Sequence, residues 1–182
     1  VTGVQTCALP ICLDLQEDDV WLASLSPAHV GGVALLTRAL FLGNRLIARG
    51  RFDVGGAVAA LESNEGPTHL SLVPTQLHQL LDAWRGPRAP SRLRCILIGG
   101  AHAPSGLVTR AVGQGWPISL TYGATEMTSQ IATATPSETG AGRFDVGRPV
   151  SGVEVVVAED GEILTRGATQ SLGYVGADRS EE

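Results

Sequence analysis

The sequence predicts an α/β fold, in which a mostly parallel sheet is flanked by helices and followed by the start of a β-rich subdomain. Short runs of aliphatic and β-branched residues alternate with segments of helical periodicity, and glycine, proline or asparagine separates them. Repeated strand, helix, strand units favour parallel strands joined by right-handed crossovers. A chain of 182 residues with 43% hydrophobic residues is long enough to bury one sizeable core.

Five segments have the pattern of strands in this sheet. They are residues 20–25, 44–48, 69–73, 93–98 and 118–121. Helical patterns occupy the intervals at 32–42, 54–63, 75–84 and 105–112. Asp53 has the side chain of an N-cap for the second helix, and Pro74 suits the first turn of the third.

The character of the sequence changes after Pro136. Residues 137–142 are small and polar, and the strand patterns at 153–157 and 162–165 flank a turn, as in a hairpin. We therefore expect residues 13–136 to form the α/β core and residues 143–177 to begin a truncated, β-rich subdomain.

The two ends differ from the rest of the chain. Residues 1–12 lack an initiating Met and the basic flank of a signal peptide, and they resemble the translation of a sequencing adaptor. Residues 178–182 look like a second adaptor. We expect both ends to be artefacts and the chain to be an internal fragment of a longer protein; the alternative is a pair of ordinary frayed termini.

Composition argues against several function classes. A net charge of -5 and no basic stripe argue against binding to nucleic acid or to anionic membranes. The most apolar run, Val30 to Leu42, contains Arg38 and is shorter than the ~20 residues of a membrane span. The three cysteines form neither a CxxC pair nor an even set, which fits a reducing compartment and predicts a cytoplasmic protein.

Polar loops follow the fourth and fifth predicted strands. Residues 99–101 follow one strand and residues 122–126 follow the next, and open parallel sheets bind ligands beyond the carboxyl ends of their strands. Tyr122 offers a stacking face, Thr125 a hydroxyl for a phosphate oxygen, and Glu126 a carboxylate for Mg²⁺. Taken singly, a glycine pair is usually a turn, a Tyr usually core and a Glu usually a solvated charge. Their combination predicts a site for a nucleotide with its metal.

The segment Tyr122-Gly-Ala-Thr-Glu126 resembles the YGxTE signature of the adenylate-forming superfamily, which includes acyl-CoA synthetases and peptide-synthetase adenylation domains. Further segments agree with this family in order and spacing. They are Ser26-Pro-Ala-His-Val-Gly-Gly32, Val73-Pro-Thr-Gln-Leu77, Ile98-Gly-Gly-Ala101, Gly147-Arg-Pro149, and Gly161-Glu-Ile-Leu-Thr-Arg-Gly167 with Gly173-Tyr174. The resemblance covers about residues 19–176. It implies that the chain is part of the large N-terminal domain of an adenylate-forming enzyme.

Within the superfamily, residues 125–131 and 28–32 resemble o-succinylbenzoate-CoA ligase of menaquinone biosynthesis most closely. The segment Ser26-Pro-Ala28 departs from the usual Pro-Leu-Phe-type sequence, and Ala124 stands where that family often has Met. The alternatives are another aryl- or fatty-acyl-CoA ligase, a peptide-synthetase adenylation domain, and a non-catalytic nucleotide-binding remnant.

The resemblance implies an acid-thiol ligase that uses ATP, Mg²⁺ and CoA with a small-molecule carboxylic acid. The residues implied to bind the nucleotide are Gly99, Gly100, Ala101, Tyr122, Gly123, Ala124 and Thr125. Glu126 is implied to be the Mg²⁺ ligand, and it forms the catalytic set with Thr125 and His29. Substrate contacts are implied for His29, Ser129 and Gln130.

The resemblance also indicates what lies outside this sequence. The family's phosphate loop would precede Val20, and its ribose-binding aspartate, hinge and lysine-bearing C-terminal domain would follow Gly176. We therefore expect the 182 residues alone to lack adenylation activity. Two further expectations concern polar residues: His69 is expected at the surface or a sheet edge, and the acidic run from Asp14 to Asp19 is expected to be solvated.

Overall fold

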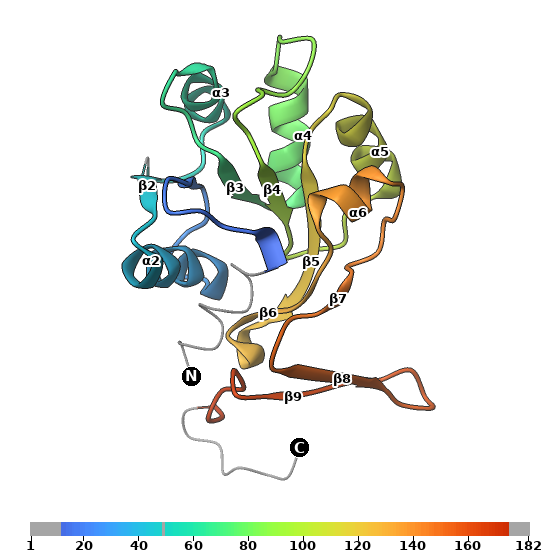
Figure 1. Cartoon of the computed structure of the whole chain (residues 1–182). Coiled ribbons are helices and arrows are strands. Elements are labelled where there is room, and N and C mark those ends of the chain that lie inside the picture. Colours follow the sequence, from blue (N-terminus) through green and yellow to red (C-terminus); the bar gives the residue numbers. More distant parts are fainter. Residues whose placement is uncertain (1–11, 49, 175–182) are drawn as a thin grey trace.

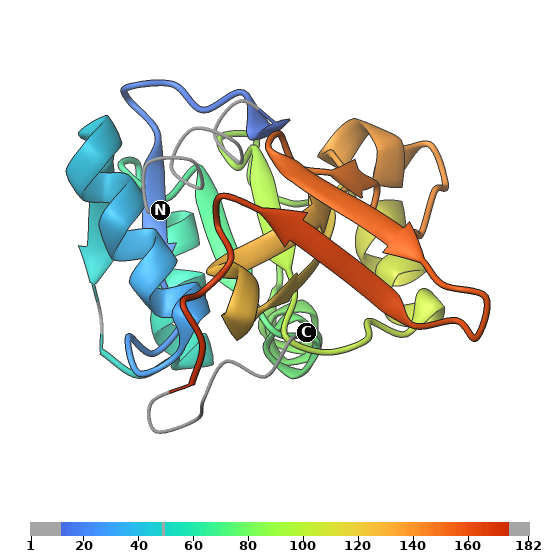
Figure 2. The ribbon, with the colours of Figure 1, turned by 90° about the horizontal axis from the view of Figure 1, so that it is seen from below.

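The computed structural model describes residues 12–48 and 50–174. Seven strands form one sheet in the order β2-β1-β3-β4-β5-β6-β7, and β8 and β9 form a separate antiparallel pair (Figures 1 and 2). The strands are β1 (Val20–Ala23), β2 (Arg45–Ala48), β3 (His69–Leu72), β4 (Cys95–Ile98), β5 (Ile118–Ala124), β6 (Ser129–Thr133), β7 (Arg148–Pro149), β8 (Val153–Val157) and β9 (Ile163–Gly167). The helices are α2 (Val30–Leu42), α3 (Val54–Glu62), α4 (Pro74–Ala83), α5 (Ser105–Gly113) and α6 (Pro136–Gly140), with a 3-10 turn η1 (Thr125–Met127).

The predicted α/β fold is confirmed. All neighbouring strands from β2 to β5 run parallel, and a helix lies in each of the four intervals where the sequence predicts one. Asp53 caps α3, because its Oδ2 accepts a hydrogen bond of 2.6 Å from the Gly56 amide. Pro74 is the first residue of α4, where its missing N–H leaves no helical hydrogen bond unmade.

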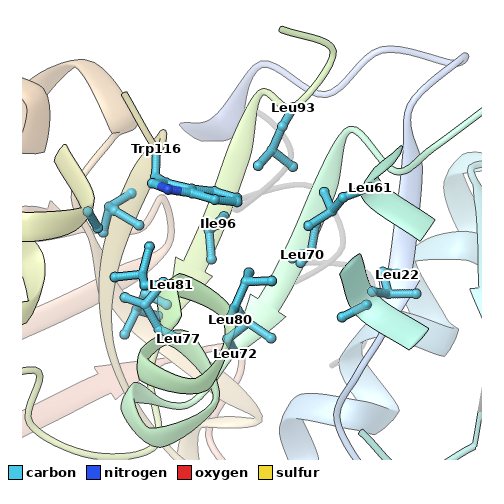
Figure 3. Packing of buried hydrophobic residues seen from close by; sticks show 14 of the residues in the cluster. Leu22, Leu61, Leu70, Leu72, Leu77, Leu80, Leu81, Leu93, Ile96 and Trp116 are labelled. Carbon is cyan, nitrogen blue, oxygen red and sulfur yellow. The ribbon is translucent and has the colours of Figure 1, made fainter. Parts of the chain in front are cut away.

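The main core lies between the sheet and helices α3, α4 and α5. Figure 3 shows Leu70, Leu72 and Ile96 of the strands packed against Leu77 and Leu80 of α4. Burying each such side chain contributes about 1.5–3 kcal/mol of hydrophobic free energy. This packing fixes the strand ends from which the polar loops emerge.

Helix α2 covers the other face of the sheet. Successive strand residues point to opposite faces, so Trp21, Cys95 and Leu97 turn away from the main core and pack in a cluster with Leu35 of α2. The Cys95 thiol is buried in this cluster, and burial raises its pKa to about 12. Among residues 12–48 and 50–174, no helix is both long and apolar enough to span a membrane.

Strand β5 is longer than the sequence predicts. The prediction ends at Thr121, but the strand continues to Ala124 and returns through η1 into the antiparallel strand β6. The polar motif at 122–126 therefore lies in a β-hairpin, with a bulge between Tyr122 and Gly123, and not in a loop that follows the sheet. Residues 122–124 were not predicted as strand because glycine and small residues have little preference for strands. Pairing with β6 determines this part of β5.

The chain leaves the main sheet after β7. Strands β8 and β9 pair from Val153 with Gly167 to Val157 with Ile163, so the predicted hairpin is confirmed. Met127 of η1 and Ile131 of β6 pack against Val150 and Val153, which ties the hairpin to the polar motif. The division into subdomains near residues 136–143 stays a prediction, and the predicted adaptor segments lie largely outside the described residues.

The expectation for His69 is wrong, and the expectation for the acidic run is wrong at Asp19, whereas Asp14, Glu17 and Asp18 are exposed as predicted. His69 of β3 is 0% exposed and Asp19 is 1% exposed. Asp19 forms an ion pair with Arg94 at 2.8 Å. The Asp19 Oδ1 lies 3.5 Å from the His69 Nδ1, and the Thr68 hydroxyl forms a hydrogen bond of 2.8 Å with the same ring nitrogen. Asp19 and Arg94 come from segments far from His69 in the sequence, so the residues around His69 do not indicate this buried network.

The His69 network is expected to make stability depend on pH. Burial lowers the pKa of His69 to about 4, against the raising effect of Asp19, so the native imidazole stays neutral while the unfolded one protonates below about pH 6.5. The free energy of unfolding should thus fall by up to about 1.4 kcal/mol per pH unit as the pH drops from about 6.5 to about 4. Urea unfolding of the wild-type chain and of His69→Gln at pH 7 and pH 5 measures this.

The exposed His102 provides the control for that experiment. His102→Gln should keep the wild-type difference between pH 7 and pH 5, because this side chain lies outside the buried network. Identical pH profiles for the wild-type chain and His69→Gln would contradict the assignment.

Candidate active site

A pocket of about 580 Å³ opens at the carboxyl edge of the parallel strands. Its wall comes from the segments that follow β1, β3 and β4, from the end of β5, and from the start of β6. The predicted site residues that line it are His29, Gly99, Gly100, Gly123, Ala124, Thr125, Ser129 and Gln130. The structure therefore brings together segments that lie about a hundred residues apart in the sequence.

Three predicted site residues lie outside this lining. Ala101, Tyr122 and Glu126 are exposed, each adjacent in sequence to a residue that does line the pocket. Tyr122 is 39% exposed, so its ring face is accessible to a planar ligand. Their predicted roles stay predictions.

A tight turn at the start of α2 positions His29. The His29 amide donates to the Ser26 carbonyl at 3.1 Å, and the His29 carbonyl accepts from the Gly32 amide at 2.9 Å. A Cβ on Gly32 would lie 2.1 Å from the Ser26 carbonyl oxygen, so only glycine allows the helix to approach this turn. His29 is thereby exposed at the pocket wall as the N-cap residue of α2.

The β5–β6 hairpin is most tightly packed beside the pocket. A Cβ on Gly123 would lie 1.8 Å from the Ser129 carbonyl oxygen, which is closer than any side chain allows. Thr128 and Ser129 have φ angles of 55° and 111°, in the left-handed region that non-glycine residues rarely adopt. Strained backbone of this kind is concentrated at functional sites, where the surrounding structure enforces it.

The η1 turn presents Thr125 and Glu126 where β5 ends. The Thr128 amide donates a hydrogen bond of 3.1 Å to the Thr125 carbonyl, which closes the turn. The buried side chain of Met127 anchors the turn to the core. The Glu126 carboxylate is exposed, and the hydrogen bond from the Tyr174 hydroxyl is the main cause that lowers its pKa below the ordinary value. Glu126 is therefore ionised at neutral pH.

Arg38 is a polar residue of the site that sequence reasoning missed. It is 3% exposed, its Nη2 donates to the Gln130 Oε1 at 2.7 Å, and its guanidinium lies 5.6 Å from the centre of the Trp21 ring. Burial lowers the pKa of Arg38 to about 10, so it remains charged at neutral pH. Gln130 lines the pocket, so the buried Arg38 guanidinium is linked to the pocket wall by a single hydrogen bond. The signal in the sequence that could have identified it is an arginine within the apolar run of α2.

The carboxylate arrangement fits a metal that arrives with a nucleotide. Within residues 12–48 and 50–174, no group of three or more His, Cys, Asp or Glu side chains could hold a metal ion. Mg²⁺ commonly binds through one or two carboxylates together with substrate phosphates, and it retains several waters. A single ionised carboxylate at Glu126, beside a pocket, meets that requirement.

Comparison with known proteins identifies the family of the chain. The family model described as AMP-binding enzyme matches residues 1–175. The 2-succinylbenzoate–CoA ligase of Bacillus pumilus is 32% identical over 177 residues, which are 92% of this chain and 36% of the relative.

Two solved structures of o-succinylbenzoate CoA synthetase from Bacillus subtilis share the fold at 27% identity. The complex with the acyl-adenylate intermediate has a TM-score of 0.88, and the match covers 98% of this chain and 38% of that one. The complex with ATP and magnesium has a TM-score of 0.87, and the match covers 97% and 38%. The chain thus spans little more than a third of the length of these relatives, and it belongs to the AMP-binding enzyme family.

Proposed function

We propose that this chain supplies the nucleotide and acyl pockets of an ATP-dependent acid-CoA ligase that acts on 2-succinylbenzoate in menaquinone biosynthesis. The observation that carries the proposal is the pocket at the carboxyl edge of the sheet, with the Thr125–Glu126 turn beside it and the buried Arg38 behind it. The Bacillus subtilis relative has been solved with ATP and magnesium and with the acyl-adenylate. The cysteine pattern supports a cytoplasmic location.

The proposed reaction has two steps. A carboxylate oxygen of the acid attacks the α-phosphorus of ATP and pyrophosphate leaves; the CoA thiol then attacks the acyl carbonyl and AMP leaves. Neither step needs a covalent bond to the enzyme, so positioning and charge stabilisation supply the catalysis.

Each site residue has a place in this proposal. Gly99, Gly100 and Ala101 border the adenine and ribose, and Tyr122 stacks on the base. Gly123 and Ala124 have small side chains that let the acyl-adenylate approach the backbone. The Thr125 hydroxyl donates to an α-phosphate oxygen. Glu126 holds Mg²⁺, which neutralises charge on the phosphates when bound.

The choice of acid follows from another part of the pocket wall. Unlike benzoate or a fatty acid, 2-succinylbenzoate keeps a second carboxylate after adenylation. His29, Ser129 and Gln130 lie on this wall, and the hydrogen bond from Arg38 polarises the Gln130 amide. A buried guanidinium attracts a carboxylate far more strongly than a solvated guanidinium does, because water screens the buried charge less. The positive wall therefore favours an acid with two carboxylates.

Binding of non-reactive adenylate analogues tests the proposal. The 182-residue chain should bind the sulfamoyl analogue of 2-succinylbenzoyl adenylate about ten to a hundredfold more tightly than the benzoyl analogue, in calorimetric titrations. This range corresponds to the ~1.5–3 kcal/mol of a hydrogen bond to a charged group. Arg38→Met should abolish the difference, and Arg38→Lys should retain part of it.

Arg45→Met is the matched control, because Arg45 is an exposed arginine that pairs with Glu65 away from the pocket. It should leave both affinities unchanged. Equal affinity for the two analogues, or a preference for a fatty-acyl analogue, would reject 2-succinylbenzoate as the substrate. Tighter binding of an aminoacyl analogue would favour a peptide-synthetase adenylation domain instead.

A further inference from the structure

The segment that follows β9 folds back onto the η1 turn. The Thr169 carbonyl accepts a hydrogen bond of 2.6 Å from the Thr128 hydroxyl, and the Ser171 amide donates to the Glu126 carbonyl at 2.6 Å. The Tyr174 hydroxyl donates to the Glu126 Oε1. We call residues 169–174 the strap. It contacts Glu126 at both its backbone and its side chain.

The strap is anchored at one end and exposed at the other. Thr169 is 0% exposed, whereas Tyr174 is 67% exposed. Because β9 is paired along its length with β8, and Val153 of β8 packs against Met127 of η1, the anchor is fixed relative to the turn. The anchored strap therefore places the Tyr174 hydroxyl beside Glu126, even though most of the Tyr174 side chain is exposed.

The chemistry of the contact favours a role in orientation. An exposed glutamate has several rotatable bonds and loses side-chain entropy when a cation fixes it. An ionised carboxylate has two oxygens with about four acceptor sites, so one bond from a phenol leaves the second oxygen for a metal. Carboxylates that bind metals are commonly held by such outer hydrogen bonds, and losing one weakens metal binding about 10–100-fold.

We propose that Tyr174 is a positioning residue that holds the Glu126 carboxylate for the divalent cation of a metal–nucleotide complex. The inference rests on the proposed function, in which Glu126 binds Mg²⁺ together with ATP. It adds that the strap, some fifty residues further along the chain, sets the orientation of that carboxylate. Tyr174 itself touches neither the cation nor the nucleotide.

The test measures cation binding separately from nucleotide binding. Mn²⁺ replaces Mg²⁺ as a paramagnetic probe, and its binding to the 182-residue chain with ATP is followed by electron paramagnetic resonance. ATP binding without metal is measured by calorimetry in the presence of a chelator. Tyr174→Phe should weaken Mn²⁺ binding about tenfold, at the low end of the range for such partners because the contact is exposed. ATP binding without metal should not change.

Two variants control the experiment. Ser171→Ala keeps the backbone donor of the strap, and it should bind Mn²⁺ as the wild-type chain does. Glu126→Gln should lose Mn²⁺ binding almost completely. Thermal unfolding of all variants detects any general loss of structure.

The outcomes separate the two proposals. If Glu126→Gln abolishes Mn²⁺ binding but Tyr174→Phe matches the wild-type chain, the proposed function stands and the positioning role is wrong. If Tyr174→Phe weakens metal-free ATP binding as much as Mn²⁺ binding, the strap supports the fold only, and the positioning role is again wrong. If the wild-type chain binds no Mn²⁺ with ATP, the assignment of Glu126 and this inference both fail.

Discussion

Replacing Glu126 with glutamine is expected to lower acid-dependent ATP–pyrophosphate exchange by at least about a hundredfold, the scale on which single groups that stabilise transition-state charge act. The experiment uses a chimaeric ligase in which residues 13–174 replace the matching segment of the Bacillus pumilus relative. Glutamine has nearly the same shape but no charge, so it is a poor Mg²⁺ ligand. Charge that develops as pyrophosphate leaves would then be less well neutralised. The fold should be preserved, because the side chain is exposed.

The control for this substitution is Glu159→Gln, which removes an exposed carboxylate in the turn between β8 and β9, outside the pocket lining. It should leave the exchange rate unchanged. Exchange by Glu126→Gln at the rate of the unmodified chimaera, at low as well as saturating Mg²⁺, would remove the assigned role. A rate that recovers fully at high Mg²⁺ would restrict that role to metal affinity.

Gly123→Ala is expected to destabilise the chain by about 3 kcal/mol or more, a cost typical of severe overpacking. The new Cβ would lie 1.8 Å from the Ser129 carbonyl oxygen, and both groups belong to the backbone of one hairpin. No rotamer change relieves such a clash, so β5 and β6 must separate at the bulge. Since Gly123, Ser129 and Gln130 all line the pocket, the pocket should change shape as well.

Urea unfolding of the chain measures the predicted loss, and Gly106→Ala provides the comparison. A Cβ on Gly106 would have no atom within 4 Å, and the residue lies in α5, where alanine is favoured over glycine by about 0.8–1 kcal/mol. Gly106→Ala should therefore leave stability unchanged or increase it. Similar stabilities for the two variants would show that the hairpin tolerates the extra atom by a small backbone shift.

Most of the fold could be predicted from the sequence, because local signals and the buried pattern agree. The cap at Asp53, the proline at the start of α4 and the apolar run of β4 each specify their element without reference to distant residues. The edge at which the polar segments meet followed from the parallel connections alone. For the same reason, most of the predicted site residues lie around one pocket.

The features that escaped prediction depend on partners far away in the sequence. The buried His69 contacts Asp19, which pairs in turn with Arg94, and the buried Arg38 donates a hydrogen bond to Gln130, 92 residues away. A charged or polar residue usually indicates a surface, so only the assembled structure shows these exceptions. The end of β5 was missed for another reason, since pairing with the neighbouring strand β6 determines it rather than its own side chains.

Part of the pocket wall is backed by a helix outside the main core, and this arrangement affects how the protein can change over evolutionary time. Helix α2 backs the wall where Arg38 meets Gln130 of β6, whereas β3 and β4 lead to other segments of the lining. Helix α2 lies on the opposite face of the sheet from α3, α4 and α5, so a substitution in it leaves the main core untouched. If the proposed function holds, substitutions in this one helix change the acid that is bound without disturbing the segments assigned to ATP.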